Sequence, residues 1–283
     1  MSMRLFGLGK QALAAGSIVW GTDTIKAMLV GFTADTHIKA ITGATNATPI
    51  VATATAHGWA DGDVVVTAGI GGNTAANGTF KLAGSTANTF NLQTFDGASV
   101  VGNGAYTSGG YAINLSKAQF LADIDAGRVG TDVTLTTKTS ALGVLDCDDI
   151  PYPLLTGAQV WGLAIYKDTG VAATSPLLYW CDGKTLVTVA AAASISATSI
   201  AVEKLEAAIA SGATIPLSNG VTATLSAQAN AGDRVLTVSA LSAAVAAGHH
   251  GDAATLGTGL PLTPSGTNVT FQIDNGIYRL VEI

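Results

Sequence analysis

The chain has 283 residues, and only 11% of them are charged, with 13 basic and 19 acidic side chains, whereas soluble domains usually carry about 25% charged residues. The mean hydropathy of +0.42 excludes a disordered chain, which needs low hydrophobicity and high net charge. A pI near 5.0 argues against nucleic-acid binding, which needs clustered Lys and Arg. The composition favours a β-rich structural or secreted protein over a cytosolic catalyst.

The N-terminal stretch carries Arg4 and Lys10 ahead of a partly apolar segment, as a secretion signal does. Gln11 and Gly16 interrupt that segment, so we expect no cleaved signal. Residues 185–202 are uncharged but contain six hydroxyl side chains, so we expect no membrane span there.

The first part of the chain predicts two strands, at 17–20 and 24–30, because both runs are rich in β-branched residues and a Gly-Thr-Asp turn separates them. The stretch from 38 to 110 then has short β-branched runs separated by Gly, Asn and Asp turns about every 8–12 residues. This spacing is typical of a small all-β barrel or sandwich. The strands expected there are 41–44, 49–53, 64–67, 79–82 and 89–92.

Longer elements are expected after residue 113. Ser116 is a suitable N-cap for a short helix over 117–121. Three further strands are expected at 133–136, 161–166 and 176–180. At the C-terminus, alternating residues on both sides of an Asp-Asn-Gly turn predict a hairpin over 268–281.

The stretch from 184 to 259 contains an internal repeat with an offset of 36 residues. Residues 188–212 align with 224–248, so that Thr188 matches Thr224 and Gly212 matches Gly248. Each copy is read as a strand, a short Ala-rich turn or helix, and a Gly stop. Two copies are too few for a solenoid, so we expect a pseudo-symmetric small β-module produced by duplication.

Motifs for catalysis and cofactor binding are missing from the sequence. The run 183–185 (GKT) ends like a phosphate-binding loop, but Leu178 stands where the first glycine belongs. The run 69–74 lacks the last glycine of a dinucleotide fingerprint. We therefore assign no catalytic and no cofactor-binding residue, and we expect a protein that is not an enzyme and needs no cofactor.

Metal binding and thiol chemistry have a few candidate side chains, each with a simpler structural interpretation. The acidic run 146–149 offers the oxygens that Ca²⁺ prefers, but it lacks the EF-hand spacing and is expected to be a solvated turn. Cys147 lies within this run, and its neighbouring carboxylates disfavour the thiolate. His249 and His250 would point apart on a strand and are expected in a loop. We therefore expect no metal site.

Aromatic residues also have structural interpretations. His57 and Gly58 are expected to form a turn, because both residue types tolerate positive φ. The four tryptophans are expected to anchor cores, with an aromatic binding platform as the alternative. They are Trp20, Trp59, Trp161 and Trp180.

Several runs resemble a family of small structural proteins of tailed bacteriophages. They are 22–30 (TDTIKAMLV), 120–129 (FLADI followed by AGRV), 164–177 (AIYKDTG followed by ATSPL), 260–266 and the Asp-Asn-Gly turn at 274–276. In compact relatives these pieces follow one another almost directly. The resemblance therefore implies a discontinuous virion-binding core made of 1–37, 114–183 and 260–283.

The two remaining stretches are then insertions into this core. The stretch 38–113 is similar to a β-module common in phage tail and other virion proteins and is expected to be a small barrel-like domain. The stretch 184–259 resembles segments of phage head decoration proteins and is expected to be an Ala-rich domain with an internal duplication. The expected fold class is mainly β: a small β-sandwich or barrel core with two inserted β-rich domains and a few short helices.

The resemblance implies a non-enzymatic capsid decoration (cement) protein, made in the host cytoplasm and located on the outer capsid surface. Its implied partners are the major capsid protein and itself, as a homotrimer, with no nucleic-acid or membrane partner. The alternative is a tail, baseplate or fibre-associated virion protein with a host-binding insert. A bacterial surface or secreted adhesion module is a third reading.

Overall fold

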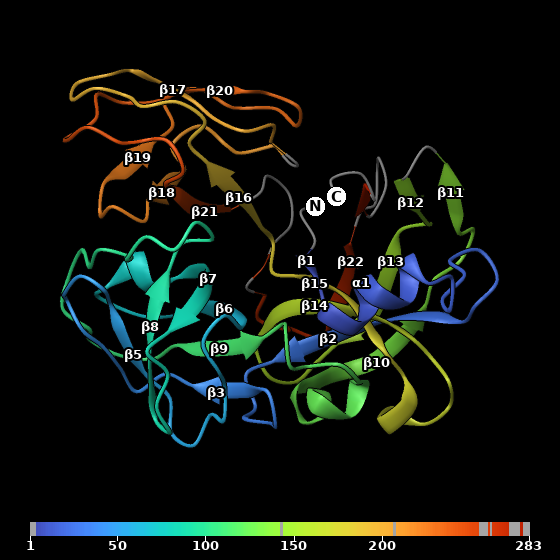
Figure 1. Cartoon of the computed structure of the whole chain (residues 1–283). Coiled ribbons are helices and arrows are strands. Elements are labelled where there is room, and N and C mark those ends of the chain that lie inside the picture. The colour runs from blue at the N-terminus through green and yellow to red at the C-terminus, as the bar shows by residue number, and fades with distance from the viewer. Residues whose placement is uncertain are drawn as a thin grey trace. The chain divides into compact units, whose positions relative to one another are not determined.

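The computed structural model describes residues 4–141, 144–205, 208–254, 260, 262–271 and 278–279, and the chain is mainly β, as the sequence predicts (Figure 1). Contacts divide the chain into two compact units. Unit 1 comprises residues 1–38, 115–183 and 257–283, and unit 2 comprises 39–114 and 184–256. The two inserted stretches therefore lie together in unit 2, where each has a hydrophobic core of its own.

A five-stranded antiparallel sheet forms the centre of unit 1, in the order β1-β15-β14-β2-β10. The strands expected at 24–30, 161–166 and 176–180 are confirmed, and the one expected at 133–136 begins five residues earlier. Both central strands, β14 and β2, are almost fully buried, which explains their continuous apolar runs. The strands are β1 (Arg4–Leu5), β2 (Ile25–Gly31), β10 (Arg128–Thr134), β14 (Val160–Lys167) and β15 (Leu177–Cys181).

Smaller sheets complete unit 1. One has the order β11-β12-β23, and the other pairs β13 with β22. The predicted C-terminal hairpin is not formed by the residues that the structure describes, because β22 pairs with β13 and β23 pairs with β12. The turn predicted at 274–276 lies outside the described residues. These strands are β11 (Thr139–Ala141), β12 (Val144–Asp146), β13 (Ile150–Leu155), β22 (Thr267–Phe271) and β23 (Tyr278–Arg279).

Two local predictions in unit 1 are wrong. Residues 17–20 form turns rather than a strand, since the backbone N–H and hydroxyl of Ser17 both bond to the carbonyl of Ala12 at the end of helix α1 (Gly7–Ala14). The expected helix over 117–121 is replaced by two short 3₁₀ turns, η2 (Leu121–Asp123) and η3 (Asp125–Gly127). A third 3₁₀ turn, η4 (Ala172–Thr174), follows β14.

The first segment of unit 2, residues 39–114, belongs to a seven-stranded sheet in the order β3-β9-β6-β7-β8-β5-β4. All five strands expected in this segment are present. The hydrophobic core of the segment includes Trp59, Phe80 and Phe90. A 3₁₀ turn, η1 (Thr74–Ala76), precedes β7. The strands are β3 (Ile38–Ala40), β4 (Gly43–Ala44), β5 (Val51–Thr53), β6 (Val64–Ala68), β7 (Gly78–Ala83), β8 (Thr89–Gln93) and β9 (Tyr111–Asn114).

The second segment of unit 2, residues 184–256, contains three two-stranded antiparallel sheets and is called the duplicated segment below. The sequence offset of 36 residues also relates two of these sheets. Thr188 pairs with His250 in the first, and Thr224 pairs with Thr214 in the second. The sheets are β16 (Lys184–Thr188) with β21 (His250–Ala254), β17 (Ser199–Ala201) with β20 (Val235–Thr237), and β18 (Thr214–Pro216) with β19 (Thr222–Thr224).

Candidate interaction surface

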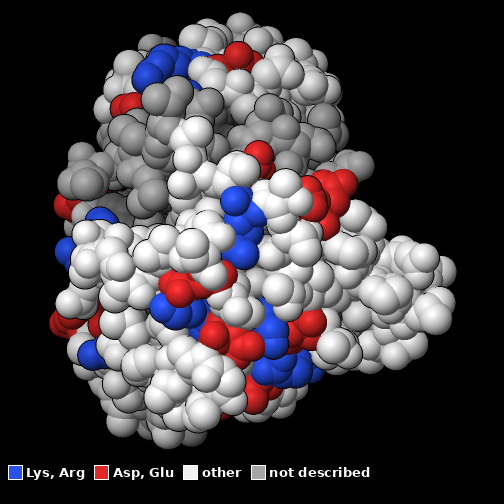
Figure 2. All heavy atoms as spheres, turned by 90° about the vertical axis from the view of Figure 1, so that its right-hand side faces the viewer, with Lys and Arg blue, Asp and Glu red and all other residues white. Residues whose placement is uncertain are grey.

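Ion pairs gather on unit 1, where they join the strands of the central sheet to neighbouring loops. The face of the molecule in Figure 2 accordingly shows basic side chains lying beside acidic ones. Because opposite charges are already paired, this face presents little net charge to a partner. The pairs are Lys26 Nζ with Asp168 Oδ2 (2.6 Å), Lys167 Nζ with Asp23 Oδ2 (2.9 Å) and Arg4 Nη1 with Asp182 Oδ1 (2.8 Å).

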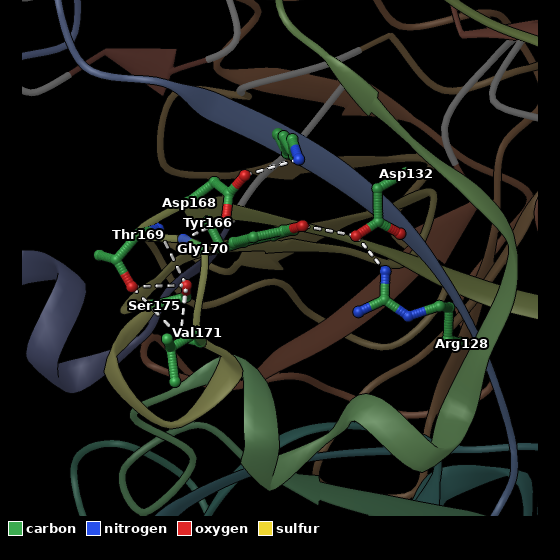
Figure 3. Close-up of polar contacts among 9 residues, drawn as sticks. Arg128, Asp132, Tyr166, Asp168, Thr169, Gly170, Val171 and Ser175 are labelled. Carbon is green, nitrogen blue, oxygen red and sulfur yellow. Dashed lines mark hydrogen bonds and ion pairs between the residues drawn. The ribbon is translucent and has the colours of Figure 1, made fainter.

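Asp132 on β10 is the centre of a partly buried polar cluster on this unit. Its carboxylate accepts a hydrogen bond from the Tyr166 hydroxyl and forms an ion pair with Arg128 (Figure 3). Arg128 also pairs with Asp125. A bulge between Val129 and Val133 interrupts the pairing of β10 with β2, and Asp132 lies within it. The cluster thus fixes the irregular edge of the sheet.

The electrostatics of the cluster follow from burial and pairing. Burial, together with the hydrogen bond to the charged Asp132, raises the pKa of Tyr166 above its usual value. Burial acts to lower the pKa of Arg128, but its bonds to Asp132 and Asp125 raise it overall. Tyr166 therefore stays a neutral donor and Arg128 a cation at any physiological pH, so this cluster is built for structure and not for proton transfer.

We expect Asp132→Ala to lower the free energy of unfolding by about 2 kcal/mol, because it removes one partner of a half-buried arginine and the acceptor of a buried hydroxyl. Tyr166→Phe removes only a donor and should cost about 1 kcal/mol. Urea unfolding of both variants measures the difference. Lys10→Gln, a change at an exposed helix residue, serves as the control and should stay within about 0.5 kcal/mol. Equal losses for the first two variants would contradict the central role of Asp132.

The loop between β14 and β15 is held by its own side chains and displays an apolar tip. The backbone N–H of Thr169 donates to Ser175 Oγ (3.1 Å), which itself donates to the carbonyl of Val171 (2.9 Å) (Figure 3). The hydrogen bond from Lys26 and that from the backbone of Gly170 lower the pKa of Asp168. Val171 is nevertheless 57% exposed. The loop therefore offers a rigid apolar contact point.

A shallow hollow of about 210 Å³ lies between β10 and β13, lined by Gly130, Tyr152 and Leu155 among others. Leu154, beside it, has φ of +46° and is 71% exposed. Pockets for drug-sized ligands usually measure about 300–1,000 Å³. The hollow is thus smaller than a pocket for a drug-sized ligand.

The side chains singled out for chemistry in the sequence do not meet in one site. Within the acidic run, Asp148 accepts hydrogen bonds from the hydroxyls of Thr136 and Thr137. The carbonyl of Asp146 accepts the indole N–H of Trp20 (3.0 Å). Among the described residues, no group of three His, Cys, Asp or Glu side chains is arranged to hold a metal ion.

Neither cysteine is placed for nucleophilic chemistry. Cys147 and Cys181 are both buried. Burial, reinforced by the charges of neighbouring aspartates, raises the pKa of each thiol to about 12. The burial expected for Cys147 is thus what the structure shows.

We expect neither thiol to react with a disulfide reagent at pH 8 in the folded protein, because the thiolate is the reactive form. Both should react at once in guanidinium chloride. Counting modified thiols by mass spectrometry under the two conditions tests this. Rapid labelling of either cysteine in the folded chain would show that the burial or the pKa direction is wrong.

Three of the four histidines, His57, His249 and His250, lie in unit 2 and have structural contacts there. His57 is buried against Trp59 and Phe90 and accepts the backbone N–H of Trp59 (3.0 Å), and burial lowers its pKa. The turn expected at His57-Gly58 lies just before it, at residues 55–56; the positive φ values there belong to Ala56 (+48°) and Gly58 (+67°) and not to His57. The loop expected for His249 and His250 is corrected in part, because His250 begins β21 and is buried.

Three of the four tryptophans are core residues, with exposed fractions of 4% or less. They are Trp20, Trp59 and Trp180. Trp161 is half-buried and packs on Phe32, with ring centroids 4.5 Å apart. The expectation that tryptophans anchor cores is therefore confirmed for three positions.

Comparisons with known proteins leave the chain without an assigned family. No protein-family model matches it, and no curated protein is significantly similar to it. Over the part of the chain that the structure describes, no helix has the length and apolar character needed to cross a membrane. The geometry of unit 1, with paired charges, a rigid apolar loop tip and a small hollow, fits contact with another protein.

Proposed function

We propose that this chain is a non-enzymatic structural protein of a tailed-phage virion, which binds the outer surface of the head and ties neighbouring major capsid subunits together. The observation that carries the proposal is the spatial distribution of the runs that resemble phage structural proteins. Residues 22–30 supply most of β2 and residues 164–177 supply the second half of β14, and these two strands are neighbours in one sheet. Runs far apart in sequence thus form one continuous part of unit 1.

The third run, residues 120–129, belongs to the same structure. It supplies η2, η3 and the first residues of β10, the strand next to β2. Phe120 forms a bridge with Pro176, and the N–H of Leu121 donates to the carbonyl of Ser175. A compact relative lacking both inserted stretches would keep all of these contacts, which supports unit 1 as the virion-binding base.

The distribution of charge supports a role in assembly. Of the ion pairs found among the described side chains, only the loose Arg234–Glu203 pair at 3.8 Å lies in unit 2. Buried protein interfaces are depleted in charged residues, and many weak contacts repeated over a symmetric shell give strong total binding. The proposed partners are the major capsid protein and further copies of this chain, as a trimer, without nucleic acid or membrane.

Cryo-electron microscopy of the virion tests this placement. We expect density for the chain on the outer face of the head in hundreds of copies. Density on the tail in six to a few dozen copies would instead establish the alternative, a tail, baseplate or fibre-associated protein with a host-binding insert. The chain's absence from the particle would overturn both.

A further inference from the structure

The hydrogen bonds of the duplicated segment occur in pairs related by the offset of 36 residues. Copy 1 is defined here as residues 188–212 and copy 2 as residues 224–248. Some pairs lie within a copy: the N–H of Glu203 donates to Thr188, and the N–H of Ser239 donates to Thr224, both at 2.8 Å. The same bond therefore closes the equivalent loop in each copy.

Most of the remaining paired bonds cross from one copy to the other. A bond from copy 1 to copy 2 has a counterpart from copy 2 to copy 1 at the equivalent positions. In one such exchange, the N–H of Ala193 donates to Val245 O (2.8 Å) and the equivalent N–H of Ala229 donates to Ile209 O (3.0 Å). In another, the N–H of Gly212 donates to Leu225 O and the equivalent N–H of Gly248 donates to Val189 O, both at 2.8 Å. The copies are interlocked and do not stand side by side as independent repeats.

A pseudo-twofold axis passes through the pairing of β17 with β20. Ile200 pairs with Leu236, its own equivalent in the other copy, as residues on a twofold axis must. The shared core has the same symmetry, since equivalent apolar side chains from both copies are buried in it. These include Val189 with Leu225, Val202 with Val238, Leu205 with Leu241 and Ile209 with Val245.

The chain passes from one copy to the other through a tight turn between β18 and β19. The N–H of Leu217 donates to Val221 O (2.8 Å), and Gly220 has φ of +82°, a conformation that glycine adopts without steric cost. This turn is the direct covalent connection between the interlocked copies. If it cannot close, every other pairing stays available from a second chain.

We infer that the duplicated segment is a fused dimer whose two halves can be exchanged between chains, so that the partner it accepts is the complementary half of a second copy of this protein. Reciprocal exchange of identical elements is a low-cost route to dimers, and it depends on the connecting turn. Two chains would then be joined through the same bonds that now close one chain. This inference is independent of the proposed location on a virion.

Deleting Ser218, Asn219 and Gly220 from the full chain tests the inference. Pro216 pairs with Thr222, so Leu217 and Val221 would then have to close a two-residue turn, which needs positive φ that neither residue type readily adopts. We expect the mass measured by light scattering to double relative to that of the unmodified chain under the same conditions. Gly232→Val is the matched control: it strains another turn of the same segment, where φ is +93° and no atom lies within 4 Å of the added Cβ. This variant should lose stability without doubling in mass.

A disulfide identifies the exchanged halves. Ala193 and Val245 bond to each other through both backbone groups, so their Cα atoms are about 5.5 Å apart, within disulfide range. Two variants of the shortened chain are prepared, one with Ala193→Cys and the other with Val245→Cys. They are unfolded, mixed, refolded together and oxidised. We expect a covalent heterodimer, which the same variants in the unshortened chain should not form. A folded monomer, an unfolded chain or a dimer without this cross-link would each overturn the inference.

Discussion

Gly162→Ala should lower the free energy of unfolding by about 3 kcal/mol, at the upper end of the cost of overpacking a core. Gly162 lies in β14, at the centre of the unit 1 sheet. A Cβ there would lie 2.3 Å from the Cη2 and Cζ2 atoms of Trp180, and the Trp180 side chain is only 2% exposed. Because the indole is buried, either the sheet or the ring must shift against its packed neighbours to make room for the methyl group.

Urea unfolding measures this loss, and two variants make the result specific. Gly21→Ala is the control, because no atom lies within 4 Å of its added Cβ and its backbone is not left-handed. It should change stability by less than about 0.5 kcal/mol. Trp180→Phe removes the ring atoms that clash, so the double variant should lose less than the sum of the single losses. Additive losses would show that the contact does not govern the effect.

The buried strands of the central sheet could be predicted because their residues agree with their surroundings. β2 and β14 are runs of β-branched and other apolar residues, and both faces of the sheet are covered. The 36-residue repeat was visible for the same reason, since apolar positions recur in both copies. A repeat in sequence does not say which copy supplies the partner strand, so the interlocked pairing could not be read from it.

Helix α1 shows why some elements could not be predicted. It contains Gly7 and Gly9, which disfavour helices, and Phe6 at its N-cap offers no side-chain hydrogen bond. Gly9 is nevertheless required, because a Cβ at this position would lie 2.5 Å from the carbonyl oxygen of Leu177. The helix exists because it packs closely on β15, and that contact joins residues far apart in the sequence.

The candidate surface was missed for a related reason. Asp132, Arg128 and Tyr166 have no recognisable spacing as a motif, and they meet only because β10 and β14 lie on opposite sides of β2. The failed helix over 117–121 is similar. The Asp123 carboxylate accepts the N–H groups of Gln119 and Phe120, so a side chain supplies the bonds that a helix would have needed.

His250→Ala should uncouple the two segments of unit 2 while each keeps its fold. The imidazole is 3% exposed, and its Nε2 lies 3.2 Å from the carbonyl oxygen of Thr79 on β7. It also packs against the rings of Phe80 and Phe95, with centroids 6.1 and 5.5 Å away. All three partners belong to residues 39–114, whereas His250 belongs to the duplicated segment. Removing the imidazole should lower the free energy of unfolding by about 3 kcal/mol, as the loss of a buried aromatic ring does.

Two probes distinguish uncoupling from general destabilisation. Trp59 is the only tryptophan of unit 2, and because it lies in the core of the first segment, its environment reports on that core. Exchange of the backbone N–H groups of Val202 and Val238, which bond across the two copies, reports on the duplicated segment. In the unmodified chain both segments should open with the same free energy, because a shared contact surface makes unfolding cooperative. In His250→Ala the two values should separate.

His249→Ala is the matched control for this experiment. His249 is the neighbouring residue, and its Nδ1 lies 3.0 Å from the hydroxyl of Ser218, but it is not among the aromatic contacts to the first segment. Its loss should cost about 1 kcal/mol, the value of one hydrogen bond, and leave the two opening free energies equal. If His250→Ala lowers both values by the same amount, the two segments are held together by other contacts, such as the bond from Val101 N–H to Ser218 O (2.9 Å). If the two opening free energies separate in His250→Ala and not in His249→Ala, the His250 side chain is the main link between the cores of the two segments, which are separated by residues 115–183 in the sequence.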